Sequence, residues 1–369
     1  MEAIQVQGAP GYYQCYPGVV NQLPVKMEEN QLRHGLIIHG GKSWEAAKEY
    51  IPSLPAKITY EKYNGECTHE EVNRINDLIT GDTVDVVIGI GGGKIADITK
   101  ACGNATNLPV ILIPTLASNC APWTALSVFY DEAGNFLEYE AFPRSTFMLL
   151  VDPDIIVHSP TPYLRAGIGD TIAKWYEADV LMRALPAKSI PLEVSLHAAR
   201  LCRDVLLENG AEAITSMEQA DISDAFTKVI ETIIMAGGMV GGYGDQYGRI
   251  SGAHSIHNGL THVPETHPFL HGDKVAYGIL VQLSLEQRPE EMKKLLPFYN
   301  KLQLPVSLQD LGIKENIEAA VNKIAERATK PSESIHFMGV SSADEVKEGI
   351  WKLEGTRNLS LCPRIPLSP

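Results

Sequence analysis

The chain has 369 residues, of which 44% are hydrophobic and 21% are charged, and its formal net charge is −14 at pH 7. Its length is enough to bury a large core and, at about 150 residues per domain, predicts two domains. The acidic balance argues against partners such as nucleic acids or anionic membranes, because no basic stretch offsets it. Apolar runs fall short of the roughly 18 residues that span a bilayer, and the N-terminus lacks a signal-peptide pattern, so we expect a cytoplasmic protein.

The cysteines show no C-x-x-C spacing, so we expect neither a disulfide framework nor a cysteine zinc site. The six of them are Cys15, Cys67, Cys102, Cys120, Cys202 and Cys362. Most are expected to be buried thiols. Cys120 is the exception, since it lies in a polar loop that follows a predicted strand.

Roughly the first 150 residues alternate short apolar runs with helical patterns, which is typical of a doubly wound α/β sheet. Thr68-His-Glu-Glu71 has the pattern of a capping box, and Asp131-Glu-Ala-Gly134 predicts the turn of a hairpin. Helices are predicted over 43–50 and 68–79, and a strand, a glycine turn and a helix over 84–100. Further strands are predicted over 36–39, 57–60, 110–114, 126–130, 136–139 and 147–152.

The glycine turn reads Gly89-Ile-Gly91-Gly-Gly93-Lys94 and follows an apolar run rich in β-branched residues. Such a run suits a strand that is buried on both faces, and the glycines let backbone N–H groups approach a phosphate at the next helix N-terminus. The turn therefore predicts a dinucleotide site. It matches neither the common G-x-G-x-x-G spacing nor a Walker loop, and a tight turn without a ligand is the alternative.

After Pro153 the strand patterns end and amphipathic segments with a period near 3.6 follow, so we expect an all-α second domain. The predicted domains are 1–158, a Rossmann-like dinucleotide-binding domain, and 159–369, a helical domain. The glycine-rich segment 236–244 is either a flexible linker or a site of close helix packing. The predicted helices cover 162–182, 192–208, 221–235, 250–259, 272–285, 289–302, 313–329 and 342–353.

The helical half carries a candidate metal site. Five of the 11 histidines fall within the 18 residues from His254 to His271, and Gly167-Ile-Gly-Asp170 adds a carboxylate. One carboxylate and two imidazoles, with a coordination position left open, describe a catalytic Zn²⁺ or Fe²⁺ centre. His254 and His257 are three apart and so share a helical face. The alternative is that these are solvated or core histidines, and the spacing does not say which three residues are ligands.

Together these motifs resemble the metal-dependent (group III, iron-containing) alcohol dehydrogenases, and within them the glycerol dehydrogenase branch, over nearly the whole chain. The resemblance implies a dehydroquinate synthase-like fold: an α/β dinucleotide-binding domain plus an all-α domain. The motifs that carry it are Gly91-Gly-Gly93-Lys94-x-x-Asp97-x-x-Lys100, Pro114-Thr115-x-Ala-Ser118, Leu126-Ser-Val-x-Tyr130, Gly167-x-Gly-Asp170, His254-x-x-His257-Asn258-Gly259 and His271-Gly-x-Lys274-Val-Ala-Tyr-Gly278.

Carried over by position, the resemblance assigns the divalent metal to Asp170, His254 and His271. It places His257 beside the metal, where it relays a proton or orients the substrate and the nicotinamide. The residues that it implies for cofactor binding are Gly92, Gly93, Lys94, Asp97, Thr115, Ser118, Thr124, Leu126 and Tyr130.

Two departures from the glycerol dehydrogenase pattern bear on specificity. Cys120 stands where that branch has an aspartate that contacts the polyol, and loss of this charge favours an anionic substrate, with Trp123 adding bulk nearby. Gly40 stands where NAD-preferring enzymes place an acidic residue for the ribose 2′-OH, so NADP(H) is expected over NAD(H). His39, Lys42 and Ser43 then bind the 2′-phosphate, or Lys42 is only an exposed residue at a helix start.

A closer likeness, to bacterial hydroxycarboxylate dehydrogenases, lies in the loop at Cys120 and in Gly169-Asp170-Thr-x-Ala-Lys174-Trp-Tyr-Glu-Ala178. It implies metal-assisted, NAD(P)H-dependent reduction of 2-oxo acids to 2-hydroxy acids. Lys174 faces the substrate carboxylate in this hypothesis, or else pairs with Glu177 or Asp179.

Other activities remain open. The first alternative is an NAD-dependent glycerol or 1,2-diol dehydrogenase, with a polyol as the substrate. A cyclase of the dehydroquinate synthase type and a non-enzymatic cofactor sensor are weaker alternatives, because the first lacks basic residues around the histidines and the second predicts a broken metal set. A homo-oligomer is expected from the family.

Overall fold

The computed structural model describes residues 3–81, 83–132 and 134–357. These fall into two compact units, Met1–Arg249 and Ile250–Pro369. Cys362 lies outside the described residues. Among the other cysteines Cys67, Cys102 and Cys202 are buried, as expected, while Cys15 and Cys120 are partly exposed.

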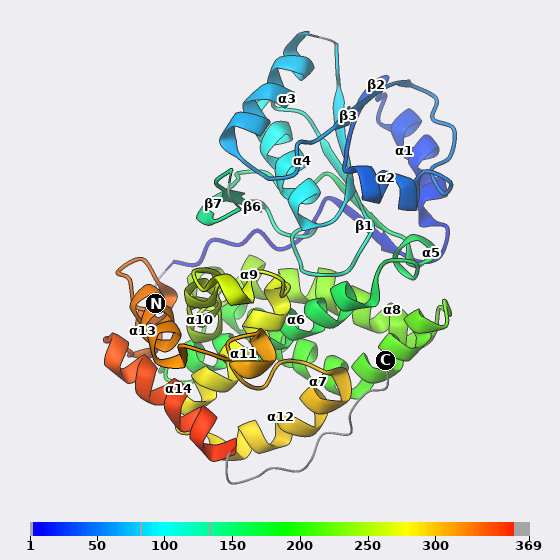
Figure 1. The fold of residues 1–369 in the computed structure, drawn as a ribbon. Coiled ribbons are helices and arrows are strands. Elements are labelled where there is room, and N and C mark those ends of the chain that lie inside the picture. The colour runs from blue at the N-terminus through cyan, green and yellow to red at the C-terminus, as the bar shows by residue number, and fades with distance from the viewer. Residues whose placement is uncertain (1–2, 82, 133, 358–369) are drawn as a thin grey trace. The chain divides into compact units, whose positions relative to one another are not determined.

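A six-stranded parallel sheet forms the centre of the α/β part of the first unit. Helices α3 and α4 lie on one side of it and α1 and α2 on the other (Figure 1), which confirms the predicted doubly wound arrangement. The strands, in spatial order, are β1 (Tyr12–Cys15), β8 (Met148–Val151), β5 (Val110–Pro114), β4 (Val86–Gly91), β2 (His34–His39) and β3 (Lys57–Lys62). The helices are α1 (Leu23–Glu29), α2 (Gly41–Ala47), α3 (His69–Gly81) and α4 (Gly93–Ala105).

The strand order reverses between β2 and β4. From β2 the chain crosses to β3 on one side, whereas from β4 it proceeds to β5 and β8 on the other. Ligands of open α/β sheets bind outside the carboxyl ends of the strands at such a switch point. Gly40 follows β2 and the glycine turn follows β4, so both candidate cofactor segments lie at this point.

Some elements were not predicted. Strand β1 has four half-buried residues without alternation, and α1 and the short α5 (Pro153–Ile156) also went unseen. The predicted hairpin is confirmed as β6 (Leu126–Tyr130) and β7 (Phe136–Ala141), which pair antiparallel in a separate sheet.

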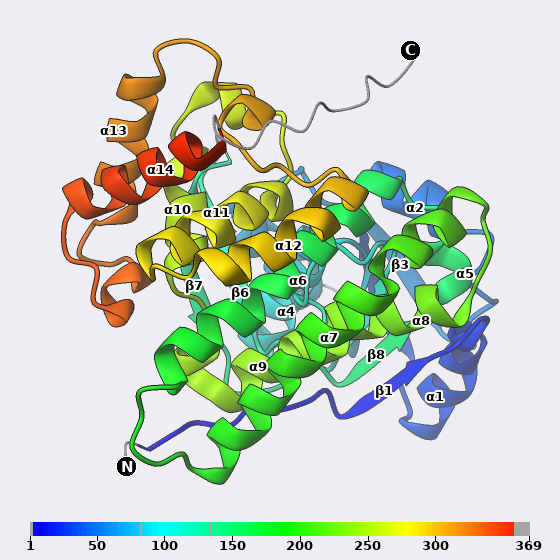
Figure 2. The same ribbon diagram turned by 90° about the horizontal axis from the view of Figure 1, so that it is seen from below.

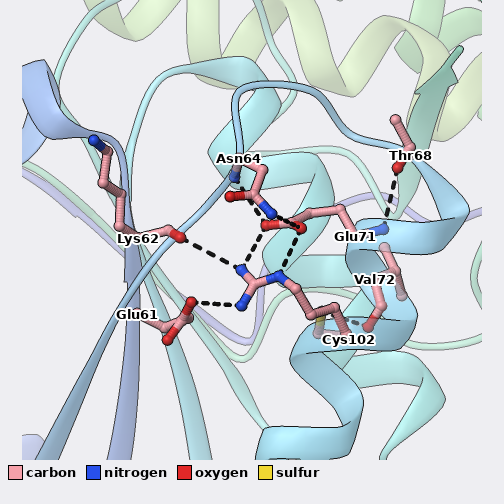
Figure 3. A network of polar contacts seen from close by, with 8 residues as sticks. Glu61, Lys62, Asn64, Thr68, Glu71, Val72 and Cys102 are labelled. Atoms are coloured by element: carbon pink, nitrogen blue, oxygen red, sulfur yellow. Dashed lines mark hydrogen bonds and ion pairs between the residues drawn. The ribbon is translucent and has the colours of Figure 1, made fainter. Parts of the chain in front are cut away.

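The capping box at the start of α3 is half confirmed. Thr68 Oγ1 accepts a hydrogen bond from Glu71 N at 3.1 Å. The Glu71 carboxylate, however, does not bond back to the helix start and instead accepts hydrogen bonds from Asn64 and from the Arg74 guanidinium (Figure 3). Arg74 also pairs with Glu61 at 2.7 Å, so this network joins the end of β3 to α3.

Helices follow the sheet, as predicted, but the first of them belong to the same compact unit as the sheet, and the domain boundary at residues 158 and 159 remains a prediction. In the first unit α7 packs against α6, α8 and α9. These helices are α6 (Thr161–Met182), α7 (Ile190–Glu218), α8 (Asp224–Glu231), a π-helical segment (Thr232–Ala236) and α9 (Gly237–Gly244).

The glycine-rich segment packs closely instead of forming a linker. A Cβ on Gly238 would lie 2.3 Å from the Trp123 side chain, and one on Gly244 would lie 2.4 Å from Ser195 Oγ. The span Asp224–Tyr247 is long and apolar enough to cross a membrane, contrary to expectation, but 61% of its most apolar window is buried inside the structure. It therefore has the properties of a core helix.

In the second unit α10 packs against α11 and α13, and α14 packs against α11 and α13 (Figure 2). The helices are α10 (Gly252–Thr261), α11 (His271–Leu285), α12 (Pro289–Leu302), α13 (Ile317–Ala328) and α14 (Ala343–Arg357), with short helical turns between them.

Candidate active site

The glycine turn caps α4 at the carboxyl end of β4. Gly92 is the N-cap residue, and Thr115 N at the end of β5 donates to Gly91 O at 3.1 Å. A Cβ on Gly92 would lie 2.8 Å from Leu116 Cδ1, and one on Gly93 would lie 2.6 Å from Asn119 Nδ2. A larger residue at either position would therefore push aside the Leu116 or Asn119 side chain of the following loop.

Lys94 lies one residue into α4 and is partly exposed. Its ammonium forms an ion pair with Glu66 and lies 5.6 Å from the centre of the Tyr130 ring. Two predicted cofactor residues, Lys94 and Tyr130, are thus neighbours. Glu66 is not recognisable as a site residue from the sequence, because only the fold brings the loop before α3 to the first turn of α4.

Asp97, one of the predicted cofactor residues, is buried beside Lys100, and the carboxylate and the ammonium lie 3.0 Å apart. Burial raises the pKa of Asp97, which the Lys100 charge partly offsets. The Lys100 ammonium also donates to three main-chain oxygens of the following loop, those of Ala121, Thr124 and Leu126. Any effect of Asp97 on cofactor binding is therefore indirect, through the position of the loop that Lys100 anchors.

The loop after β5 also lies against α6. A Cβ on Gly167 would be 2.2 Å from Ala117 O and 3.0 Å from the Cα of Ser118. This close approach gives a physical reason for the first glycine of the Gly167-Ile-Gly-Asp170 motif. Trp123 is packed in the interior, with its Nε1 donating to Gly8 O at 2.9 Å, so its bulk does not line an open pocket.

At the end of β2, Gly40 caps α2 and leaves no acidic side chain. Ser43 Oγ accepts from Gly40 N at 3.0 Å and donates to Ile90 O at 2.9 Å, so this hydroxyl is already engaged. Lys42 is exposed. Lys62, which was not predicted as a site residue, also lies here, with its ammonium 3.7 Å from the position of a Cβ on Gly41.

Helix α6 carries Asp170 and Lys174, which are both buried. Burial by itself lowers the pKa of Lys174, but Cys120, Asp170 and Glu177 around it outweigh this, and the net shift is upward. Lys174 Nζ donates to Arg249 O at 3.4 Å. The alternative partner Asp179 instead pairs with Arg183, also at 3.4 Å.

The Cys120 side chain packs against the start of α9: its Cβ lies 3.5 Å from the position of a Cβ on Gly237. Burial raises the pKa of the Cys120 thiol, against the opposing effect of Lys174. Cys120 is therefore a neutral thiol beside a cation.

Three of the clustered histidines converge within the second unit. The ring centre of His271, the first residue of α11, lies 5.4 Å from that of His254 and 4.1 Å from that of His257, both on α10. Burial, then His271, Lys274 and His254, holds the pKa of His257 well below its ordinary value. His257 is therefore a neutral imidazole.

The remaining two members of the cluster lie apart from these three. His262 accepts a hydrogen bond from Arg327 at 3.1 Å, and His267 contacts Thr261 O at 3.0 Å.

Residues 10–153 match the family described as iron-containing alcohol dehydrogenase. The chain is 40% identical to hydroxycarboxylate dehydrogenase A of Escherichia coli (strain K12), over 95% of this chain and 98% of that protein. It is 35% identical to glycerol dehydrogenase of Thermotoga maritima, over 89% of this chain and 90% of that protein. The crystal structure of glycerol dehydrogenase from Schizosaccharomyces pombe superposes with a TM-score of 0.87 and 28% identity, covering 100% of this chain and 96% of that chain.

The parallel sheet with its glycine turn, the helical part with its convergent histidines and these relatives together define an oxidoreductase that acts on alcohol groups. The chain belongs to the iron-containing alcohol dehydrogenase family, which confirms the resemblance and the dehydroquinate synthase-like fold class. The ligand and cofactor residues assigned from the resemblance remain predictions.

Proposed function

We propose that this dehydrogenase reduces 2-oxo acids to 2-hydroxy acids with NADPH and a divalent metal ion. The observation that carries the substrate class is the buried Lys174 beside Cys120, where the sequence lacks the expected carboxylate. A charged ammonium with a neutral thiol suits a substrate carboxylate, whereas paired hydroxyls would be served better by an acceptor. The proposal is supported by the similarity to hydroxycarboxylate dehydrogenase A.

The cofactor assignment rests on the switch point of the sheet. The pyrophosphate is assigned to the N-terminus of α4 at Gly92, Gly93 and Lys94, where backbone N–H groups and the helix dipole favour an anion. The 2′-phosphate is assigned to the start of α2, where Gly40 supplies no acidic side chain and where Lys42 and Lys62 are the proposed cationic partners. When the cofactor binds, its pyrophosphate replaces the Glu66 carboxylate as the partner of the Lys94 ammonium.

The proposed metal ligands are Asp170, His254 and His271. A carboxylate and two imidazoles suit Zn²⁺ and Fe²⁺ alike, so the donor set fits a divalent ion without choosing between them. When bound, such an ion would polarise the carbonyl oxygen at C2, and the nicotinamide would supply hydride to the same carbon.

The chain's own residues then orient the substrate and move the proton. Lys174 holds the substrate carboxylate, and the loop at Cys120, which Lys100 anchors, shapes the pocket. His257 is a neutral imidazole at rest, so it first accepts a proton from solvent and then donates that proton to the alkoxide oxygen, which returns the ring to its starting tautomer. The net reaction consumes one NADPH and one proton for each 2-hydroxy acid formed.

The deciding assay follows the oxidation of NADPH and NADH with 2-oxobutanoate, 2-oxoglutarate and dihydroxyacetone, with and without a chelator. We expect the highest kcat/KM for a 2-oxo acid with NADPH, and loss of turnover on chelation. Preference for dihydroxyacetone with NADH would instead support a glycerol or 1,2-diol dehydrogenase, the activity in the name of the Thermotoga maritima relative. A cytoplasmic homo-oligomer is the proposed state: sedimentation of the purified protein tests the oligomer, and cell fractionation tests the location.

A further inference from the structure

His257 belongs to a chain of hydrogen bonds that continues away from the convergent histidines, inside the second unit. His257 Nδ1 lies 3.1 Å from Asn258 Oδ1, and Asn258 Nδ2 donates to Glu333 Oε2 at 3.0 Å. The other carboxylate oxygen of Glu333 accepts from Arg327. Only 4% of the Glu333 side chain and 14% of the Arg327 side chain are exposed, so the pair is shielded from water.

The direction of this chain follows from its far end. Arginine has donors only, so Glu333 accepts from Arg327 through one oxygen, and its second oxygen is left as an acceptor for Asn258. If the Asn258 amide were reversed, its carbonyl oxygen would face a carboxylate oxygen at 3.0 Å, with no proton between them. The amide nitrogen must therefore face Glu333, and Oδ1 must face His257.

An amide oxygen accepts and does not donate, so the hydrogen bond at His257 requires a proton on Nδ1. We propose that Asn258 and Glu333, anchored by Arg327, are positioning residues that hold His257 in the Nδ1–H tautomer. The lone pair is then on Nε2, for which the structure gives no hydrogen-bond partner among the described residues. Nε2 is thus the ring nitrogen that accepts a proton and then passes it to the substrate.

The backbone keeps the far end of the chain in place. Glu333 caps the short turn Ser334–Met338, and the Ile335 N–H in that turn donates to Ser255 Oγ on α10 at 3.0 Å. Asn258 lies on the same helix, one turn after Ser255. The carboxylate and the amide are therefore fixed relative to each other by a contact that does not involve His257.

The inference rests on the proposed function only for the catalytic use of Nε2, so its main test does not depend on turnover. Two-bond ¹H–¹⁵N spectra of the metal-free protein, labelled with ¹⁵N-histidine and assigned with His257→Gln, show which ring nitrogen carries the proton. We expect Nδ1–H alone in the wild type. Glu333→Gln offers both a donor and an acceptor to Asn258, so we expect both tautomers of His257 in that variant.

Asn258→Ala is the second variant, because it interrupts the series of hydrogen bonds without removing the buried Glu333–Arg327 pair. His257 should then no longer be held in a single tautomer. Glu326→Gln, an exposed neighbour on α13, is the matched control and should keep Nδ1–H. In the active enzyme we expect kcat to fall roughly 10-fold or more in Glu333→Gln and Asn258→Ala, with the Kd for NADPH unchanged.

Nδ1–H alone in both variants, or Nε2–H in the wild type, would overturn the inference. Absence of 2-oxo acid reduction in the wild type would overturn the proposed function instead, and the spectra would still decide the tautomer.

Discussion

Lys174 is a buried cation with Asp170 and Glu177 near it, and the proposed function gives its ammonium a further partner in the substrate carboxylate. The carboxylates near it on α6 favour the protonated form, and its hydrogen bond at 3.4 Å to Arg249 O is long. We expect Lys174→Met to raise KM for a 2-oxo acid about 10- to 100-fold, the equivalent of one lost charge-assisted hydrogen bond, and to leave KM for dihydroxyacetone nearly unchanged.

Steady-state kinetics with both substrates check this prediction, with Lys228→Met, an exposed lysine on α8, as the control. An equal rise in KM for the acid and for the neutral ketone would assign Lys174 a structural role only.

The position of the Lys62 ammonium is set by the register between β2 and β3. Lys62 is the last residue of β3 and pairs in register with His39, the last of β2, so its ammonium lies beside the start of α2. We expect Lys62→Met to raise KM for NADPH about 10-fold and to leave KM for NADH unchanged, because only NADPH carries the 2′-phosphate.

Lys48→Met, at the other end of α2, is the matched control for cofactor kinetics. A parallel loss with NADH would show that Lys62 does not recognise the 2′-phosphate. Neither Lys62 nor Glu66 could be predicted as a site residue, since their neighbours are far away in sequence and only the sheet brings them together.

Among the elements, α6 shows the structural role of a glycine that belongs to a sequence motif, Gly167. Its backbone approaches the Ala117 carbonyl so closely at Gly167 that a methyl group has no room, and a backbone atom cannot move aside as a side chain does. We expect Gly167→Ala to lower the free energy of unfolding by about 1–3 kcal/mol through overpacking. Urea denaturation measures this, with Gly355→Ala, which meets nothing within 4 Å on α14, as the control.

The start of α3 gives a pH-dependent prediction. Burial alone raises the pKa of Glu71, but the hydrogen bonds from Arg74 and Asn64 outweigh it, so the net shift is downward (Figure 3). A carboxyl with a lowered folded-state pKa stabilises the protein above its unfolded-state pKa, about 4.3, and this contribution is lost as the pH falls through the folded-state value.

Glu71→Gln should therefore destabilise the protein at pH 7 by about 1–3 kcal/mol, and the difference from wild type should shrink below about pH 4. Chemical denaturation across this pH range checks the sign, and exposed Glu70→Gln is the control. A difference that grew on acidification would contradict the network.

Periodicity predicted most elements, because amphipathic helices such as α12 and buried strands such as β5 carry strong patterns. It failed where tertiary contacts decide. The segment Gly237–Gly244 packs as a helix in which the Trp123 and Ser195 side chains lie against Gly238 and Gly244. Strand β1 forms because it pairs with β8. The candidate histidines were found because they are close in sequence, whereas Glu333 and Arg327 were missed because they are remote.

At the scale of the whole molecule, cofactor binding should raise the free energy of unfolding. NADPH at 100 times its Kd should raise the free energy of unfolding by about 2.7 kcal/mol, seen as a higher Tm. His254→Ala should abolish turnover and keep this effect of NADPH, since the proposed dinucleotide residues all lie in the first unit. Full activity of the thoroughly demetallated protein would rule out the proposed metal chemistry.

The Lys100 ammonium fastens the loop that contains Cys120 to α4, and it does so through the main-chain oxygens of Ala121, Thr124 and Leu126. Such an anchor does not depend on which side chains the loop carries. Substitutions at Cys120 can therefore alter the pocket while the loop keeps its course. The course of the loop is therefore held independently of the Cys120 side chain, whereas Leu116, Asn119 and Trp123 are constrained by the glycines against which they pack.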